Sequence, residues 1–138
     1  MTDHLVSPDA MMSIAGKEYC LDGSFSTLKA LQHAFGKDIV DVQSSIHLMR
    51  LDEFAKLLCI LVECSGHRAD EGVIGAWLVD EVGIVSYEQD GLRLRIMGFL
   101  AVAMTPNRER EKKRSEMANL IAEHASISSL GENTEISA

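Results

Sequence analysis

The chain has 138 residues, which is the size of one domain. Hydrophobic residues make up 46% of it and aromatic residues only 5%, so we expect a core of aliphatic and methionine side chains, as in helical bundles rather than β-sandwiches. The formal net charge of −8 argues against a nucleic acid partner, because phosphate binding needs a basic face.

The sequence carries no signal that places the protein in or across a membrane. The N-terminus has neither the basic nor the apolar region of a signal peptide, and the run from Ile96 to Met104 is too short to cross a bilayer. Its three cysteines are an odd number without the spacing of a disulfide framework, which indicates reduced thiols. We therefore predict a cytoplasmic protein with no membrane partner.

The N-terminal third is predicted to contain a leader, a hairpin and two helices. Residues 1–10 are expected to be a flexible leader, and residues 11–106 to form a helical domain that starts with a short β-hairpin turning at Gly16. Ser24 or Ser26 is expected to cap a first helix that Gly36 ends, and a second helix is expected after Asp38.

A third helix is predicted from Asp52 to Cys64, and it is apolar around most of its circumference. A helix with one face in water does not show this pattern, so this helix is expected to be central or to lie in an interface. Because so apolar a helix is hard to bury in one small bundle, we expect the protein to form a homo-oligomer.

The C-terminal half is predicted to hold two further core helices and a charged extension. Asp70 is expected to cap the fourth helix, and the fifth is expected from about Gln89 to Met104. Residues 107–138 are expected to form an exposed, charged helix to about His124 and then a disordered tail. The fold class is therefore mainly α, a small bundle of about five to six helices with an N-terminal β-hairpin.

Metal binding and cysteine catalysis have weak support. Cys59, Cys64, His67 and Asp70 are metal-ligand types, but they lack the tight pairing of thiolates in a structural zinc site, so no metal is expected. Cys64 with His67, or Cys20 with His33, could form a nucleophilic pair, but no flanking signature accompanies either pair. No phosphate-binding glycine motif is present, and we expect neither a cofactor nor an enzymatic activity.

One stretch of the chain resembles a known family. The order of Gly16-Lys17, Tyr19, a turn, Leu28 with Leu31, Phe35-Gly36 and several short helices is similar to phage-derived tail proteins of gene transfer agents and related prophages. The members are labelled tail tube or tail assembly chaperone proteins, and the match covers residues 11–106.

The resemblance implies a noncatalytic tail assembly chaperone, which binds the amphipathic helices of a tape measure protein. A structural tail component, such as a tube or connector, and a small enzyme using Cys64 or His67 are the alternatives. Helix-in-groove binding is compatible with the surplus of apolar residues in this chain. The candidate partner-binding residues, each assigned either to a groove or to the core, are Leu57, Leu61, Met97 and Leu100.

Overall fold

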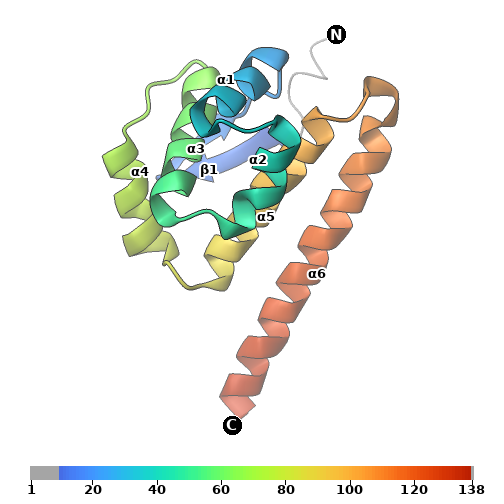
Figure 1. Ribbon diagram of the computed structural model, residues 1–138. Helices are drawn as coiled ribbons and strands as arrows, with labels where there is room; N and C mark the ends of the chain where they lie inside the picture. The colour runs from blue at the N-terminus through green and yellow to red at the C-terminus, as the bar shows by residue number, and fades with distance from the viewer. Residues whose placement is uncertain (1–9, 138) are drawn as a thin grey trace.

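The computed structural model describes residues 10–137, with side chains described to residue 126. Over these residues the chain forms six α-helices, linked by short 3₁₀ and π-helical turns, and a two-stranded sheet at its N-terminus (Figure 1). The predicted fold class is confirmed. Apart from Ala10, which is buried, the leader predicted for residues 1–10 lies outside the described residues.

The hairpin forms where the sequence predicts it. Strand β1 (Met11–Ile14) pairs antiparallel with β2 (Lys17–Cys20), and Ala15 and Gly16 connect them, both with positive φ. Two such residues form the tight turn whose twist matches that of the flanking strands. An isolated hairpin is marginally stable in water, but here the side chains of Met12 and Ile14 are buried against the helices.

The first two helices begin at the predicted residues, although the Ser24 side chain before α1 accepts no capping hydrogen bond. Helix α1 (Phe25–Phe35) ends at Gly36, which adopts the left-handed conformation. Helix α2 (Ile39–Ser45) follows Asp38, whose carboxylate accepts a hydrogen bond from a backbone N–H in the first turn of the helix. A 3₁₀ turn, η3 (Ile46–Leu48), leads from α2 to the next helix.

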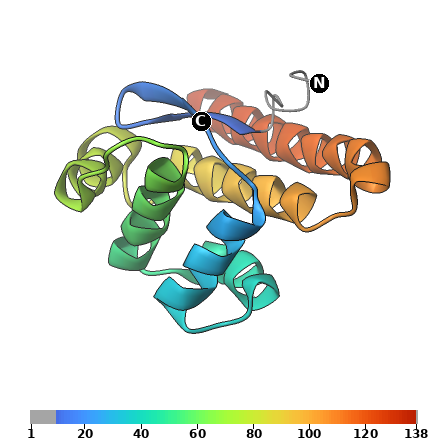
Figure 2. The same ribbon diagram turned by 90° about the horizontal axis from the view of Figure 1, so that it is seen from above.

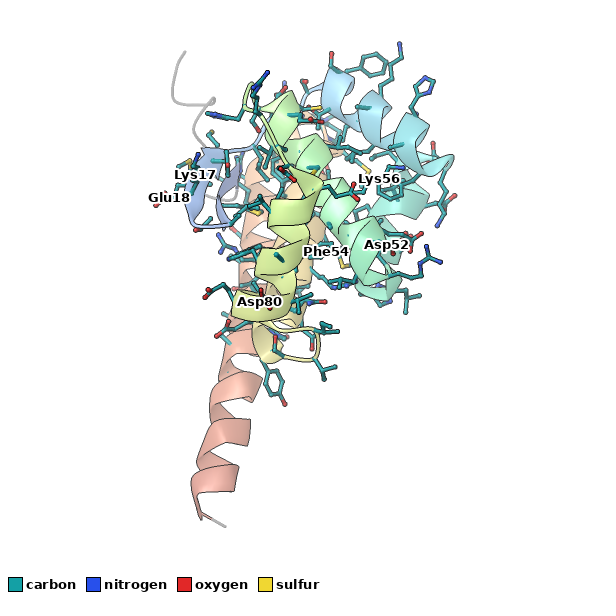
Figure 3. All side chains as sticks on the ribbon, turned by 90° about the vertical axis from the view of Figure 1, so that its left-hand side faces the viewer. Lys17, Glu18, Asp52, Phe54, Lys56 and Asp80 are labelled. Atoms are coloured by element: carbon teal, nitrogen blue, oxygen red, sulfur yellow. The ribbon has the colours of Figure 1, made fainter. Side chains whose placement is uncertain are left out.

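Helix α3 (Leu51–Cys64) crosses the centre of the molecule. Its buried residues occupy one broad side of the helix, and Asp52, Lys56 and Glu63 are exposed on the other. Phe54, which Figure 3 labels together with Asp52 and Lys56, has no exposed surface. The hairpin, α1, α4 and α5 contribute to the same hydrophobic cluster. Of the two placements expected for α3, the structure shows the central one, because its own chain covers its apolar side. The homo-oligomer stays a prediction.

Helices α4 and α5 complete the body. Helix α4 (Glu71–Trp77) begins after Asp70, which caps it as predicted, and continues into a π-helical turn, η4 (Leu78–Val82). Helix α5 (Tyr87–Ala103) starts two residues before the predicted position, because the Ser86 hydroxyl accepts a hydrogen bond from the backbone N–H of Gln89.

The last helix differs most from the sequence-based expectation. After a 3₁₀ turn, η5 (Asn107–Glu109), helix α6 runs from Arg110 to Ser137, beyond the predicted end near His124. No proline follows Pro106, and Gly131 is the only glycine in this segment, so few residues oppose helix propagation. Helix α6 lies alongside α5 (Figures 1 and 2), and its C-terminal end extends past the body (Figure 1).

Candidate functional site

The residues predicted to bind a partner lie mainly in the core. Leu57, Leu61 and Leu100 have no exposed surface, and Met97 is half-buried against the core cluster. The sequence left each of these residues open to a groove role or a core role, and Leu57, Leu61 and Leu100 have the core role. A partner cannot contact them in this fold, so a docking surface must be formed by other residues.

Cys64 and His67 do not form a hydrogen-bonded pair in the part of the chain that the structure describes. No hydrogen bond joins the Cys64 thiol to His67, whose ring instead packs edge-on against Tyr19 with a centroid distance of 5.1 Å. Cys59 is buried, and burial, followed by the negative charge of Glu71, raises the pKa of its thiol to about 11. A thiol with so high a pKa is a poor nucleophile at neutral pH.

Neither a metal-binding cluster nor a membrane-spanning helix is present among the described residues. No group of three or more His, Cys, Asp or Glu residues is placed to hold a metal ion. None of the described helices is both long enough and apolar enough to cross a bilayer.

A buried arginine, which sequence reasoning did not single out, organises the centre of the bundle. The Arg93 guanidinium donates hydrogen bonds to the carbonyl oxygens of Ile46 and Met49, both at 2.8 Å, and to the Gln89 side-chain oxygen at 2.9 and 3.1 Å. It also lies over the Phe54 ring, 4.5 Å from the centroid. Every one of these contacts is within the chain, so Arg93 has a structural role.

Helices α5 and α6 form an antiparallel pair that is held at three levels. At one end Arg110 donates hydrogen bonds to the carbonyl oxygens of Ala103 (3.3 Å), the last residue of α5, and of Thr105 (2.9 Å), which lies just beyond it. In the middle, a Cβ on Gly98 would lie 3.4 Å from the Cβ of Met117. Contacts of this kind bring the two helix backbones close together.

The third level of attachment lies at the N-terminus of α5. The Nε2 atom of His124 is 3.1 Å from the carbonyl oxygen of Tyr87, and the two rings meet edge to face. The ring of His124 also lies over Gly91. Gly91 and Gly98 are seven residues apart, as are Met117 and His124, and this matched spacing is the sequence signal that could have predicted the pairing.

Beside these contacts, α5 and α6 line an open groove with a volume of about 600 Å³. Gly98 and Phe99 of α5 form part of it, and small or apolar side chains of α6 form most of the rest. Alanines at the groove wall leave room for the side chains of another element. The apolar residues that α6 contributes are Met117, Ala118, Ile121, Ala122 and Ala125.

Charged side chains also border the groove. Arg95 from α5 and both Glu111 and Arg114 from α6 belong to its lining. The Arg95 guanidinium also donates a hydrogen bond to the Met11 carbonyl oxygen at 3.1 Å, which ties β1 to the α5 side of the groove. The groove thus has the anatomy of a protein-binding surface, with an apolar floor and a charged rim.

A second exposed apolar feature lies at the corner between η4 and α5. Ile84, Val85 and Tyr87 are exposed there, and the side chain of Val85 is 97% exposed. This corner protrudes and is not part of the groove lining. It offers apolar contact area but no concave site, so we assign the candidate site to the groove.

Comparisons with known proteins add no relative to this description. No family model, no curated protein and no solved structure matches the chain.

Proposed function

We propose that this protein is a noncatalytic helix-binding protein, and that it acts in the cytoplasm as an assembly chaperone for a phage-like tail. Its client is an amphipathic helical segment of a tape measure protein, and its binding site is the α5–α6 groove. The observation that carries the proposal is the groove itself, which has an apolar floor on two helices and charged residues at its border. No cofactor or metal takes part.

The dimensions of the groove suit a helix. Its α6 lining extends from Glu111 to Ala125, a rise of about 21 Å at 1.5 Å per residue. A docked helix would place about four turns along this length, with apolar side chains at positions i, i+3 or i+4 and i+7. The alanines of the wall would receive these side chains, because they leave space close to the α6 backbone.

The resemblance of residues 11–106 to tail proteins of gene transfer agents supplies the identity of the client. Tape measure proteins have long apolar helices, which need a covering partner before the tail tube surrounds them. The groove of this chain would give such a helix a temporary apolar environment. Charged residues on the surrounding surface would keep the complex soluble.

Co-expression with a tape measure protein tests the proposal. We expect the unaltered chain to keep the tape measure protein in the soluble fraction and to co-purify with it. The variant Ala118→Arg places a long charged side chain at the groove wall, so recovery of the tape measure protein should fall about tenfold, a loss of about 1.4 kcal/mol of binding free energy.

Asn119→Arg is the matched control, because it adds the same charge one residue away on α6, outside the groove lining. It should leave recovery unchanged, and circular dichroism should show that both variants are folded. Equal recovery with both variants, or no co-purification with the unaltered chain, would contradict the proposal.

A structural tail component and a small cysteine enzyme are still alternatives to this function. A tube or connector protein would remain in purified particles, whereas an assembly chaperone should be absent from them. An enzyme would lose a measurable activity on Cys64→Ala or His67→Ala. The described geometry at these two residues provides no positive support for catalysis.

A further inference from the structure

Helix α6 packs on the body without entering its core. None of its described side chains, from Arg110 to Ser126, is buried, and neither Met117 nor Ile121 belongs to the hydrophobic cluster that joins the other helices and the hairpin. Its half-buried residues recur at helical spacing on the side that faces α5, at positions 110, 113, 114, 117, 121 and 124. The body therefore does not need α6 to complete its core.

Helix α5 has a second buried face beneath α6 (Figure 2). Its residues Ile96 and Leu100 pack in the hydrophobic cluster. Val102 is also buried, but it does not belong to that cluster. Residues four apart share a face of a helix, so Val102 lies on the same stripe as Gly98, which Met117 covers. A movement of α6 would make this stripe accessible, and the glycine in it would let another helix approach closely.

The attachment of α6 is firmest at its first residue. The two hydrogen bonds of Arg110 to the end of α5 lie next to the η5 connection. Farther along, Met117 packs against Gly98, and the ring nitrogen of His124 meets the Tyr87 carbonyl oxygen at the surface. An exposed hydrogen bond adds little to stability, because water competes for both partners. A rotation at η5 can therefore separate the distal part of α6 and keep the bonds of Arg110.

The groove between α5 and α6 is smaller than a helix. Its volume is about 600 Å³. A helix with a diameter of about 10 Å occupies about 1,600 Å³ over about 21 Å, which is the length of the α6 lining. The groove thus admits the side chains along one face of a helix but not the helix itself. A wider gap would let a client contact both α5 and α6 over more of its circumference.

We propose that α6 is a movable lid on the groove. It rotates away from α5 at the η5 connection while the body stays folded, and a client helix then enters the widened groove. In the closed position α6 covers the second face of α5, so it limits access to that face when no client is present. The lid rests on the proposed function only in its occupant, because the movement of α6 can be measured without a client.

A disulfide between α5 and α6 tests the lid. A Cβ added at Gly98 would lie 3.4 Å from the Cβ of Met117, close to the roughly 3.8 Å between the Cβ atoms of linked cysteines. Oxidation of Gly98→Cys/Met117→Cys should therefore hold the lid closed, and reduction of the same variant should release it. Gly98→Ser/Met117→Ser, which cannot form this link, is the matched control under both conditions. Peptide mass spectrometry identifies the linked pair.

Hydrogen exchange in the absence of a client measures the movement. In the unaltered chain, the amides of residues 111–126 should exchange about tenfold faster than those of α3, because a detached helix is marginally stable in water. Oxidation of the cysteine variant should slow exchange in residues 111–126 about tenfold and leave α3 unchanged. Equal protection of α3 and α6 in the unaltered chain would mean that α6 opens only with the whole body, and it would overturn the proposal. That comparison needs no substitution, so it holds even if the variant does not fold.

Binding of a heptad-patterned helical peptide from a tape measure protein measures the consequence. The oxidised cysteine variant should bind it about tenfold more weakly than the reduced variant and the serine control, because the lid cannot open. Equal affinity with the lid locked and released would overturn its control of the groove. No binding by any form would contradict the proposed function, and the exchange result would then decide the movement of α6 by itself.

Discussion

At the scale of single residues, the buried guanidinium of Arg93 shows what a local pattern does not reveal. Its position, between Leu92 and Ile96 and four residues after Gln89, is on the apolar side of α5. Sequence reasoning treats an isolated arginine as a surface residue, because arginine is almost never fully buried unless it is paired. Here the pairing groups are backbone carbonyls of the α2–α3 connection, and only the fold brings them near.

Replacement of Arg93 should strongly destabilise the protein. Burial lowers the pKa of this guanidinium, and Asp90 opposes that shift, but an arginine stays protonated in a protein. Arg93→Met would leave the carbonyl oxygens of Ile46 and Met49 buried without these donors, so we expect a loss of about 3 kcal/mol in the free energy of unfolding. Urea denaturation measures it.

Arg95→Met is the matched control on the same helix. Arg95 is exposed and donates one hydrogen bond, to the Met11 carbonyl oxygen, so its loss should cost less than about 1 kcal/mol. Equal destabilisation by the two substitutions would show that the contacts of Arg93 have no special importance.

Cys59 gives the protein a predictable response to alkaline pH. Its thiol has a folded-state pKa of about 11, compared with an ordinary value of 9.0, because burial disfavours the thiolate. Between these two values the unfolded chain loses the proton and the folded chain keeps it. The contribution of Cys59 to stability is therefore complete below pH 9 and is lost as the pH rises towards 11.

The measurement is the difference in unfolding free energy between the unaltered chain and Cys59→Ala. This difference should be constant from pH 7 to 8.5 and should shift by up to about 2 kcal/mol in favour of the variant by pH 11. Other titrating groups affect both proteins and cancel. A difference that does not change over this range would mean that the thiol ionises equally in both states.

At the scale of elements, signals within one element were read correctly from the sequence, and contacts between distant elements were not. The turn at Gly16, the end of α1 at Gly36, and the caps at Asp38 and Asp70 all depend on nearby backbone groups. The burial of α3 and the docking of α6 depend on helices far away in the sequence. Periodicity describes a helix face but does not say what covers it.

The close contact between α5 and α6 should be sensitive to side-chain size at Gly98. Gly98→Leu would push into Met117, whose Cβ lies 3.4 Å from the position of an added Cβ, and overpacking of this kind costs about 1–3 kcal/mol. We expect α6 to separate from α5. Trypsin cleavage within residues 108–114 should then become faster.

Gly75→Leu in α4 is the comparison for this prediction, because an added Cβ there meets no atom within 4 Å. Replacing a helical glycine with leucine also favours the helix, so this variant should be at least as stable as the unaltered chain. Similar trypsin cleavage rates for both leucine variants would argue against a tight contact between α5 and α6.

At the scale of the whole molecule, the central question is how the chain divides its apolar residues between core and surface. The sequence predicts a helical bundle with a hairpin, which is correct. It left Leu57, Leu61, Met97 and Leu100 open to a groove or a core role, and the three leucines are core. The groove was missed because its two walls come from α5 and from a segment treated as a separate extension. Its lining is rich in alanine, which gives no strong hydrophobic signal on its own.

The most direct test of the central claim is amide chemical-shift mapping by NMR while a heptad-patterned helical peptide from a tape measure protein is added. The groove predicts that shifts concentrate in residues 95–99 and 111–125, on the two helices that line it. Shifts centred instead on the Ile84–Tyr87 corner or on Cys64 and His67, or no shifts at all, would contradict the account.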